Sequence, residues 1–153
     1  MSGTYKTARR PPAHAGRVRF DTKVAVVVRD DLATWHRLNV TAFLVSGIAG
    51  AHHQLMGEPY EDADGTTYLP LLGQPVVVLE ADAATVKAAH ARALARDLAT
   101  SIYTHEMFST GHDEANRAVV RAVGRDALDL VGVAVFGPRN GVDRTVKGAR
   151  LHP

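Results

Sequence analysis

Short runs of apolar, mostly β-branched residues divide the sequence, and each run is bounded by charged or turn-forming residues. Three of them occupy residues 23–29, 75–79 and 130–136, and a shorter stretch at 101–105 has a similar pattern. Continuous apolar runs of this length are typical of strands that are buried on both faces of a sheet. The pattern therefore predicts four central strands.

The longest predicted helix covers residues 33–52 and is apolar nearly all round between Val40 and Ala51. A helix without a polar face is expected to be buried on more than one side. Its small residues allow two interpretations, which are close packing on the sheet and a dimer interface. Asp30 and Asp31 precede it, and either is a suitable N-terminal cap.

Three further helices are predicted at residues 82–100, 113–123 and 142–147. Asp82 begins the first, and Thr110 with Asp113 resembles a capping box before the second. Residues 57–70 are rich in acidic and turn-forming residues and predict an exposed loop. Strands alternating with helices predict an α/β fold, a three-layer sandwich with a mixed, mostly parallel four-stranded sheet.

The basic charge of the chain is concentrated at its N-terminus. The sequence has a pI of about 9.2, but five basic residues against Asp21 give residues 1–22 a net charge of +4. The whole chain carries +2, so residues 23–153 carry −2. We therefore expect a disordered basic tail at 1–22, which could contact phosphates, and a single slightly acidic domain at 23–153.

The chain contains no cysteine, which excludes disulfides, cysteine-bound zinc and thiol nucleophiles. No apolar run reaches the ~18 residues that a membrane span requires, and no apolar segment follows the basic N-terminal residues as in a secretory signal. These features favour a cytoplasmic protein that does not enter a membrane.

Candidate site residues lie at the start of the first predicted helix and at the end of the third predicted strand. Ligands of open α/β sheets bind at such edges, and helix N-termini attract anions. We expect one cleft to contain two groups of residues. The catalytic group consists of Glu106, His105, Arg37 and Asn39. The ligand-binding group consists of Trp35, His36, Thr104 and His112.

In a hydrolytic interpretation, Glu106 or His105 acts as general base on a water molecule while Arg37 holds the developing oxyanion. In a structural interpretation, His105 is a satisfied polar residue and Glu106 is solvated. Trp35 either stacks on a planar ligand or anchors the fold. His105, Glu106 and His112 lack the HExxH spacing of a metal site, and there is no phosphate-binding glycine motif, so neither metal nor cofactor is expected.

The order of these motifs resembles a known fold family. Residues 23–29 with Asp31-Leu32, then Gly73-Gln74-Pro75 before the second strand, and Gly137-Pro138 after the last, resemble the type II peptidyl-tRNA hydrolases. The stretch from Leu38 to Leu44, with Gly47, is similar to an uncharacterised branch of that superfamily, a domain of unknown function. The resemblance covers about residues 23–151 and implies the hydrolase-like α/β fold and a homodimer.

The site of those hydrolases is altered in this chain. Their functional lysine falls on or near Asn39, their aspartate after the third strand corresponds to Glu106, and an extra helix at 113–123 intervenes before the last strand. Two main hypotheses follow. The protein binds a small molecule without the usual tRNA hydrolase site, or it hydrolyses peptidyl-tRNA or a related ester or amide through a rebuilt site. A third is nucleic-acid binding through the tail.

Overall fold

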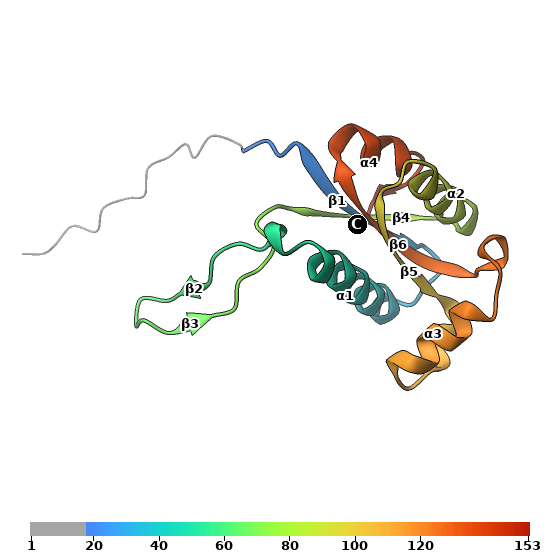
Figure 1. The fold of residues 1–153 in the computed structure, drawn as a ribbon, viewed down its shortest axis with the longest axis horizontal. Coiled ribbons are helices and arrows are strands. Elements are labelled where there is room, and N and C mark those ends of the chain that lie inside the picture. Colours follow the sequence, from blue (N-terminus) through green and yellow to red (C-terminus); the bar gives the residue numbers. More distant parts are fainter. Residues whose placement is uncertain (1–17) are drawn as a thin grey trace, which may run out of the picture.

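The computed structural model describes residues 18–153, so residues 1–17 of the expected tail lie outside the described residues. The end of that segment is held by the domain, because Thr22 begins the first strand and Arg139 donates to the carbonyls of Phe20 and Asp21. A central sheet has helices on both of its faces (Figure 1). Its strand order is β5-β6-β1-β4-β7, and the strands are β1 (Thr22–Arg29), β4 (Val76–Ala81), β5 (Ala99–Thr104), β6 (Leu130–Pro138) and β7 (Arg150–Leu151). The prediction of an α/β protein with a mixed sheet is confirmed.

The sheet has five strands rather than the predicted four, because β7 adds to the edge of β4 through the pairs Leu79–Leu151 and Glu80–Arg150. A two-residue strand is too short to leave a pattern in the sequence. The expectation of mostly parallel strands is also wrong. Of the four neighbouring pairs only β1–β4 is parallel, because β6, which runs opposite to β1, β4 and β5, lies between β1 and β5, and β7 is antiparallel to β4. An apolar run indicates burial of a strand, but not its direction.

The alternating side chains of β1 supply both halves of the core. Val24, Val26 and Val28 lie in the cluster on the side of α1 (Thr34–Ala51). Ala25 and Val27 lie in the cluster on the other side, which is covered by α2 (Ala83–Ala95) and α4 (Arg139–Thr145). Successive strand residues point to opposite faces, so the uninterrupted apolar run is explained by helices on both faces.

Helix α1 is buried on one side only, which corrects the expectation of burial on more than one side. Val40, Leu44 and Ile48 face the sheet, whereas Leu38 is 69% and Phe43 is 55% exposed. The predicted acidic cap is also wrong, because the N-cap residue is Ala33 and no side chain caps the helix. Asp31 pairs with Arg29 and Asp30 with Arg150 instead.

Helix α2 begins as predicted, since the Asp82 carboxylate accepts a 2.8 Å hydrogen bond from the Thr85 N–H. This bond lowers the pKa of Asp82. The helix ends at Ala95 rather than near residue 100, because residues from Ala99 onward pair with β6. Helix α4 begins at Arg139, three residues before its predicted start.

Residues 57–70 are not simply a loop, because they contain the hairpin of β2 (Tyr60–Glu61) and β3 (Thr67–Tyr68). It follows the short helix η1 (His53–Leu55) and runs out beyond the body of the molecule (Figure 1). Asp62 organises its turn by accepting hydrogen bonds from the Asp64 and Thr66 N–H groups and from the Tyr68 hydroxyl. These bonds, with that of Thr66 first, lower the pKa of Asp62.

Helix α3 (Asp113–Arg121) follows the short helix η2 (His105–Ser109) and precedes η3 (Arg125–Ala127). Its cap is His112, whose Nδ1 accepts from the Ala115 N–H at 3.2 Å. The predicted cap, Thr110, contacts the Met107 carbonyl and the Asn116 side chain instead. No residue of α3 is buried, so its apolar side is not sealed against the core.

Candidate functional site

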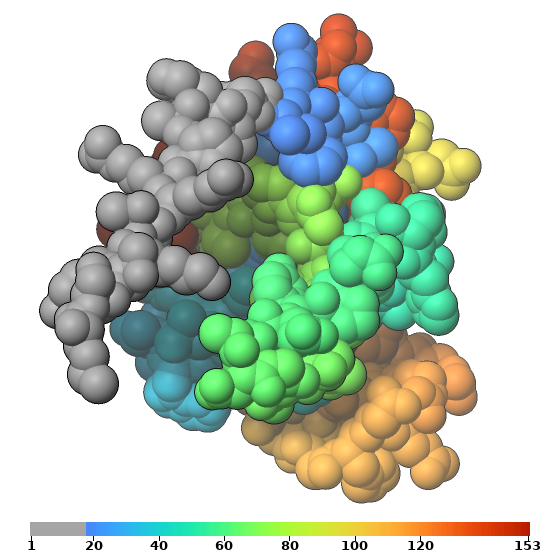
Figure 2. Space-filling view, turned by 90° about the vertical axis from the view of Figure 1, so that its left-hand side faces the viewer, coloured from blue at the N-terminus to red at the C-terminus, as the bar shows by residue number. Residues whose placement is uncertain are grey.

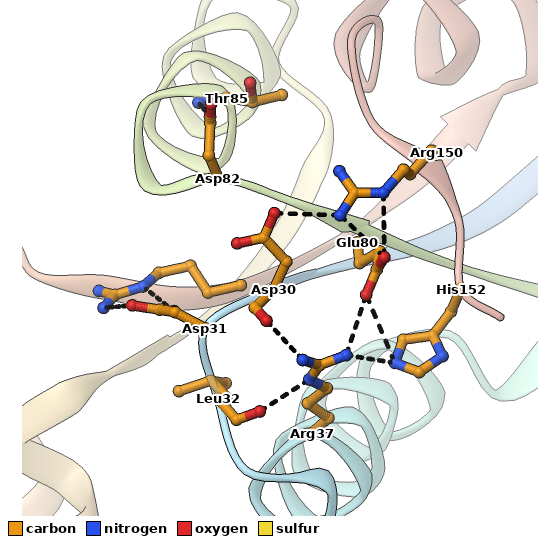
Figure 3. A network of polar contacts seen from close by, with 10 residues as sticks. Asp30, Asp31, Leu32, Arg37, Glu80, Asp82, Thr85, Arg150 and His152 are labelled. Carbon is orange, nitrogen blue, oxygen red and sulfur yellow. Dashed lines mark hydrogen bonds and ion pairs between the residues drawn. The ribbon is translucent and has the colours of Figure 1, made fainter.

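The carboxyl ends of β1 and β4 are the first place to expect a ligand. These neighbouring strands are parallel, and the helices that follow them lie on opposite faces of the sheet. Open α/β sheets bind ligands in the crevice at such a switch point. In this protein the crevice contains a network of charged side chains, in which α1, β4 and β7 meet (Figure 3).

Glu80 is the centre of this network and is only 7% exposed. Its carboxylate accepts from Arg37 Nη1 at 2.9 Å and from Arg150 Nε at 3.0 Å. The hydrogen bond to Asp30 and the charge of Glu80 raise the pKa of Arg150. A buried carboxylate is tolerated when it is paired and hydrogen-bonded in this way, so the crevice is closed by the protein's own ion pairs.

Arg37 was predicted to hold an oxyanion, but the structure directs it into this network. Its Nε donates to the Leu32 carbonyl at 2.9 Å, and Nη2 donates to the Asp30 carbonyl. Within residues 18–153 no hydrogen bond or ion pair joins Arg37 to His105 or Glu106. As folded, Arg37 therefore fixes the start of α1 to the sheet.

Three of the other predicted residues meet around Phe108, which the sequence did not single out. The ring centroids of His36 and Phe108 are 4.2 Å apart, and those of His105 and Phe108 are 5.9 Å apart. Trp35 lies on the outer side, with its ring centroid 3.8 Å from that of His36. This aromatic stack joins the first turn of α1 to η2.

The remaining predicted residues do not converge on one group. Glu106 and Asn39 are exposed. Thr104 is 1% exposed, and its hydroxyl has no hydrogen-bond partner in the described part of the chain. Of the eight predicted residues, His112 alone lines the cavity described next. A catalytic role for Glu106, His105, Arg37 and Asn39 remains a prediction.

A cavity of about 660 Å³ opens between α1, β5, η2 and α3. Its volume falls within the ~300–1,000 Å³ that is typical of small-molecule sites. The apolar part of its wall consists of Phe43, Leu44, Ile102, Tyr103, Met107 and Val120. Its polar side chains come mostly from α3 and from the segment between η2 and α3: Thr110, His112, Asp113, Asn116, Arg117 and Arg121, with Ser46 and Ser101 from the other wall.

The lining of the cavity includes several hydrogen-bond donors. Because His112 Nδ1 accepts from the Ala115 N–H, a neutral His112 ring carries its proton on Nε2, where it can donate. Burial raises the pKa of Tyr103, so its phenol keeps its proton at neutral pH. Arg117 pairs with Asp113, whereas Arg121 forms no ion pair within residues 18–153. The uncompensated charge at the cavity is therefore positive.

Among residues 18–153, no group of three or more histidine, aspartate or glutamate side chains is placed to hold a metal ion. In the same range no helix combines the length and apolar character needed to cross a membrane. The cavity is the feature of the described residues best suited to hold a ligand.

Residues 22–153 match a family model described as a protein of unknown function, DUF2000. Among solved structures, the chain is similar to a protein of unknown function, Atu0240, from Agrobacterium tumefaciens strain C58. The two are 50% identical and superpose with a TM-score of 0.86, over 88% of this chain and 100% of the other. No curated protein matches the chain.

Proposed function

This chain belongs to the DUF2000 family, and we propose that it binds a small amphipathic molecule in the cavity between α1, β5 and α3. The observation that carries the proposal is the unsealed apolar side of α3, which lies over a cavity of ligand size. The ligand has an apolar body and a carboxylate or similar anionic group.

The apolar body is argued from the wall of the cavity. Tyr103 is 6% and Leu44 is 1% exposed, so the floor is fixed by the core, whereas Val120 of α3 faces it from a helix without buried residues. Ser101 strengthens the floor by donating to the Leu44 carbonyl at 2.8 Å. An apolar ligand between these walls buries surface that is otherwise wet, and this contributes about 25 cal/mol per Å².

The anionic group is argued from the charges at the cavity. Arg121, at the C-terminal end of α3, supplies a cation without an ion-pair partner in the described range, and His112, at the N-terminal end of the same helix, adds a ring N–H donor elsewhere in the lining. A carboxylate accepts hydrogen bonds and pairs with guanidinium. An uncharged ligand of the same shape would form no ion pair with the arginine, which would stay hydrated, and such a ligand would therefore bind less tightly.

The direct test is binding of anilinonaphthalene sulfonate, a dye with an apolar body and an anionic group, followed by fluorescence. Val120→Trp fills the cavity and is expected to weaken binding at least about tenfold, or ~1.4 kcal/mol. Ala118→Trp adds the same ring at an exposed position of the same helix outside the cavity, and should bind as the wild type does. Equal binding by all three proteins would place the dye elsewhere and refute the proposed site.

Hydrolysis of peptidyl-tRNA or a related ester or amide is the alternative function. It requires Arg37 to leave Glu80, and it requires Glu106, which is exposed, to find a partner. The binding function requires neither change, so we favour it.

A further inference from the structure

The large apolar side chains on the surface are concentrated on two segments. Ten are exposed among the described residues, of which α1 carries Trp35, Leu38 and Phe43, and residues 57–73 carry Tyr60, Tyr68, Leu69 and Leu71. We call residues 57–73 the arm. Exposed apolar side chains that gather on a segment in this way mark an interaction site more often than scattered residues do.

The arm does not cover its own body. Its strands β2 and β3 pair with each other, and the arm joins the body at its base, where the Gly57 N–H donates to the Leu71 carbonyl at 2.8 Å and Met56 bridges to Leu72. Leu69 is 84% exposed. An isolated two-stranded hairpin is marginally stable in water, so packing against another surface would stabilise the arm. Figure 2 shows the arm (green) standing in front of the body, with α3 (orange) below it.

The outer face of α1 is a suitable surface. From Leu38 to Ala51 the helix has no charged residue, and Ala42 and Ser46 on this face are small and exposed. A side chain added at Gly50 would meet no atom within 4 Å. The face is therefore smooth and uncharged, and it can accept the apolar residues of an arm.

The dimensions of the two surfaces match. Helix α1 has 18 residues, which corresponds to about 27 Å at 1.5 Å per residue. One limb of the arm, from Gly57 to Asp64, has an extended length of about 26 Å at 3.3 Å per residue. The arm leaves the molecule near the C-terminal end of α1 (Figure 1). A twofold axis near this junction therefore lays each arm along the α1 helix of the other copy.

Charge distinguishes two ways in which a second copy could bind, which are arm against arm and arm against α1. The arm contains Glu58, Glu61, Asp62 and Asp64 and no lysine or arginine, so two arms repel one another and edge-to-edge pairing of hairpins is disfavoured. The outer face of α1 carries no such charge, and its first turn contains no acidic residue. The positive end of the helix dipole there attracts an acidic tip.

We infer that the protein forms a twofold homodimer in which the arm of each copy lies along the outer face of α1 of the other. Because the contact is isologous, the arm and the α1 face are each used twice. This doubling helps the interface reach the ~800 Å² per partner that stable complexes bury. The α1 face shares Phe43 and Ser46 with the wall of the cavity, but the dimer is inferred from the arm and from the apolar character of this face, and its test uses the protein without a ligand.

The oligomeric state of the full chain in solution tests this interface. Light scattering after gel filtration should give twice the 16.4 kDa chain mass. Leu69→Glu on the arm and Leu38→Glu on α1 should each give a monomer. Leu94→Glu, at another exposed leucine outside both surfaces, should remain a dimer. Circular dichroism melting confirms that each variant is folded, since all three sites are exposed.

Cross-linking tests the pairing itself, and the absence of cysteine from the chain gives a clean background. When Leu69→Cys protein is mixed with Ala42→Cys protein and oxidised, a disulfide-linked heterodimer should form. A mixture of Leu69→Cys and Leu94→Cys should form none above the level of random collision. A monomeric wild type, or a dimer that resists both glutamate substitutions and gives no specific cross-link, would overturn the inference.

Discussion

The guanidinium of Arg37 donates a 2.9 Å hydrogen bond to the carboxylate of Glu80, and this contact joins the first turn of α1 to the end of β4. Glu80 is buried and also accepts from Arg150 on β7. Three elements that are distant in sequence therefore share one buried carboxylate at the switch point of the sheet.

Glu80→Gln should lower the free energy of unfolding by about 3 kcal/mol, because it leaves the partly buried Arg37 without a counter-charge. Arg150→Gln should cost less than about 1 kcal/mol, because its side chain is 60% exposed. Urea unfolding measures both. Asp143→Asn, which breaks the more exposed pair with Lys23, is the matched control. Equal effects of Glu80→Gln and Asp143→Asn would show that the network does not stabilise the fold.

Gly132→Ala tests the packing of α1 on β6. A Cβ atom at this position would lie 2.6 Å from Val40 Cγ1 and 2.9 Å from Leu44 Cδ1. We expect a loss of about 1–3 kcal/mol in unfolding free energy from overpacking. Gly124→Ala, where nothing lies within 4 Å of the added atom, should be nearly neutral. A neutral Gly132→Ala would mean that α1 is free to move away from the sheet.

His90 makes stability depend on pH. It is 7% exposed, and burial, followed by the charge of Arg125, lowers its pKa from the ordinary value of 6.5. Below pH 6.5 the unfolded chain therefore takes up a proton that the folded chain resists. The stabilisation is complete above the unfolded pKa and is lost as the pH falls through the folded pKa.

His90→Leu should abolish this contribution. Between pH 7 and pH 5 the unfolding free energy of the wild type should fall more steeply than that of the variant. Each tenfold difference in proton affinity between the unfolded and folded chains corresponds to ~1.4 kcal/mol. The hydrogen-bonded carboxylates Asp62 and Asp82, whose pKa values are lowered, titrate in a more acidic range. Parallel pH profiles for the two proteins would show that His90 does not resist protonation in the folded state.

Hydrolysis of N-acetyl-aminoacyl-tRNA separates the two functional hypotheses. Because Arg37 is bonded to Glu80 and the Leu32 carbonyl, we expect no release above the uncatalysed rate, and no difference between the wild type and a Glu106→Gln, Asn39→Ala double variant. Activity that disappears in the variant would instead establish a rebuilt hydrolase site that rearranges when substrate binds.

The sequence predicted the core strands well, because β1, β4 and β6 are long apolar runs. It did not predict β7, since Arg150 and Leu151 join the sheet through backbone pairing with β4 and through the contact of Arg150 with Glu80. The sequence also placed Arg37 in a ligand site, whereas its side chain points to Glu80. The direction in which a helix residue points depends on how the helix packs, which the sequence pattern does not show.

The cavity was largely invisible in the sequence for the same physical reason. The pattern of residues 113–123 predicted a helix, and the apolar stripe of such a helix is normally taken to be buried. In the structure Val120 faces a cavity instead of a core. The available signal was indirect: His112, Arg117 and Arg121 accompany that stripe, but nothing in their spacing says what they surround.

The most direct test of the binding function is calorimetric titration with decanoate and with decanol, which share an apolar chain and differ in charge. We predict that decanoate binds more tightly to the wild type, that Arg121→Gln weakens decanoate but not decanol, and that Arg96→Gln, which removes the same charge outside the cavity, changes neither. Two results would contradict an anion-binding cavity between α1, β5 and α3. Either the two ligands bind with equal affinity and no arginine substitution changes it, or neither ligand binds.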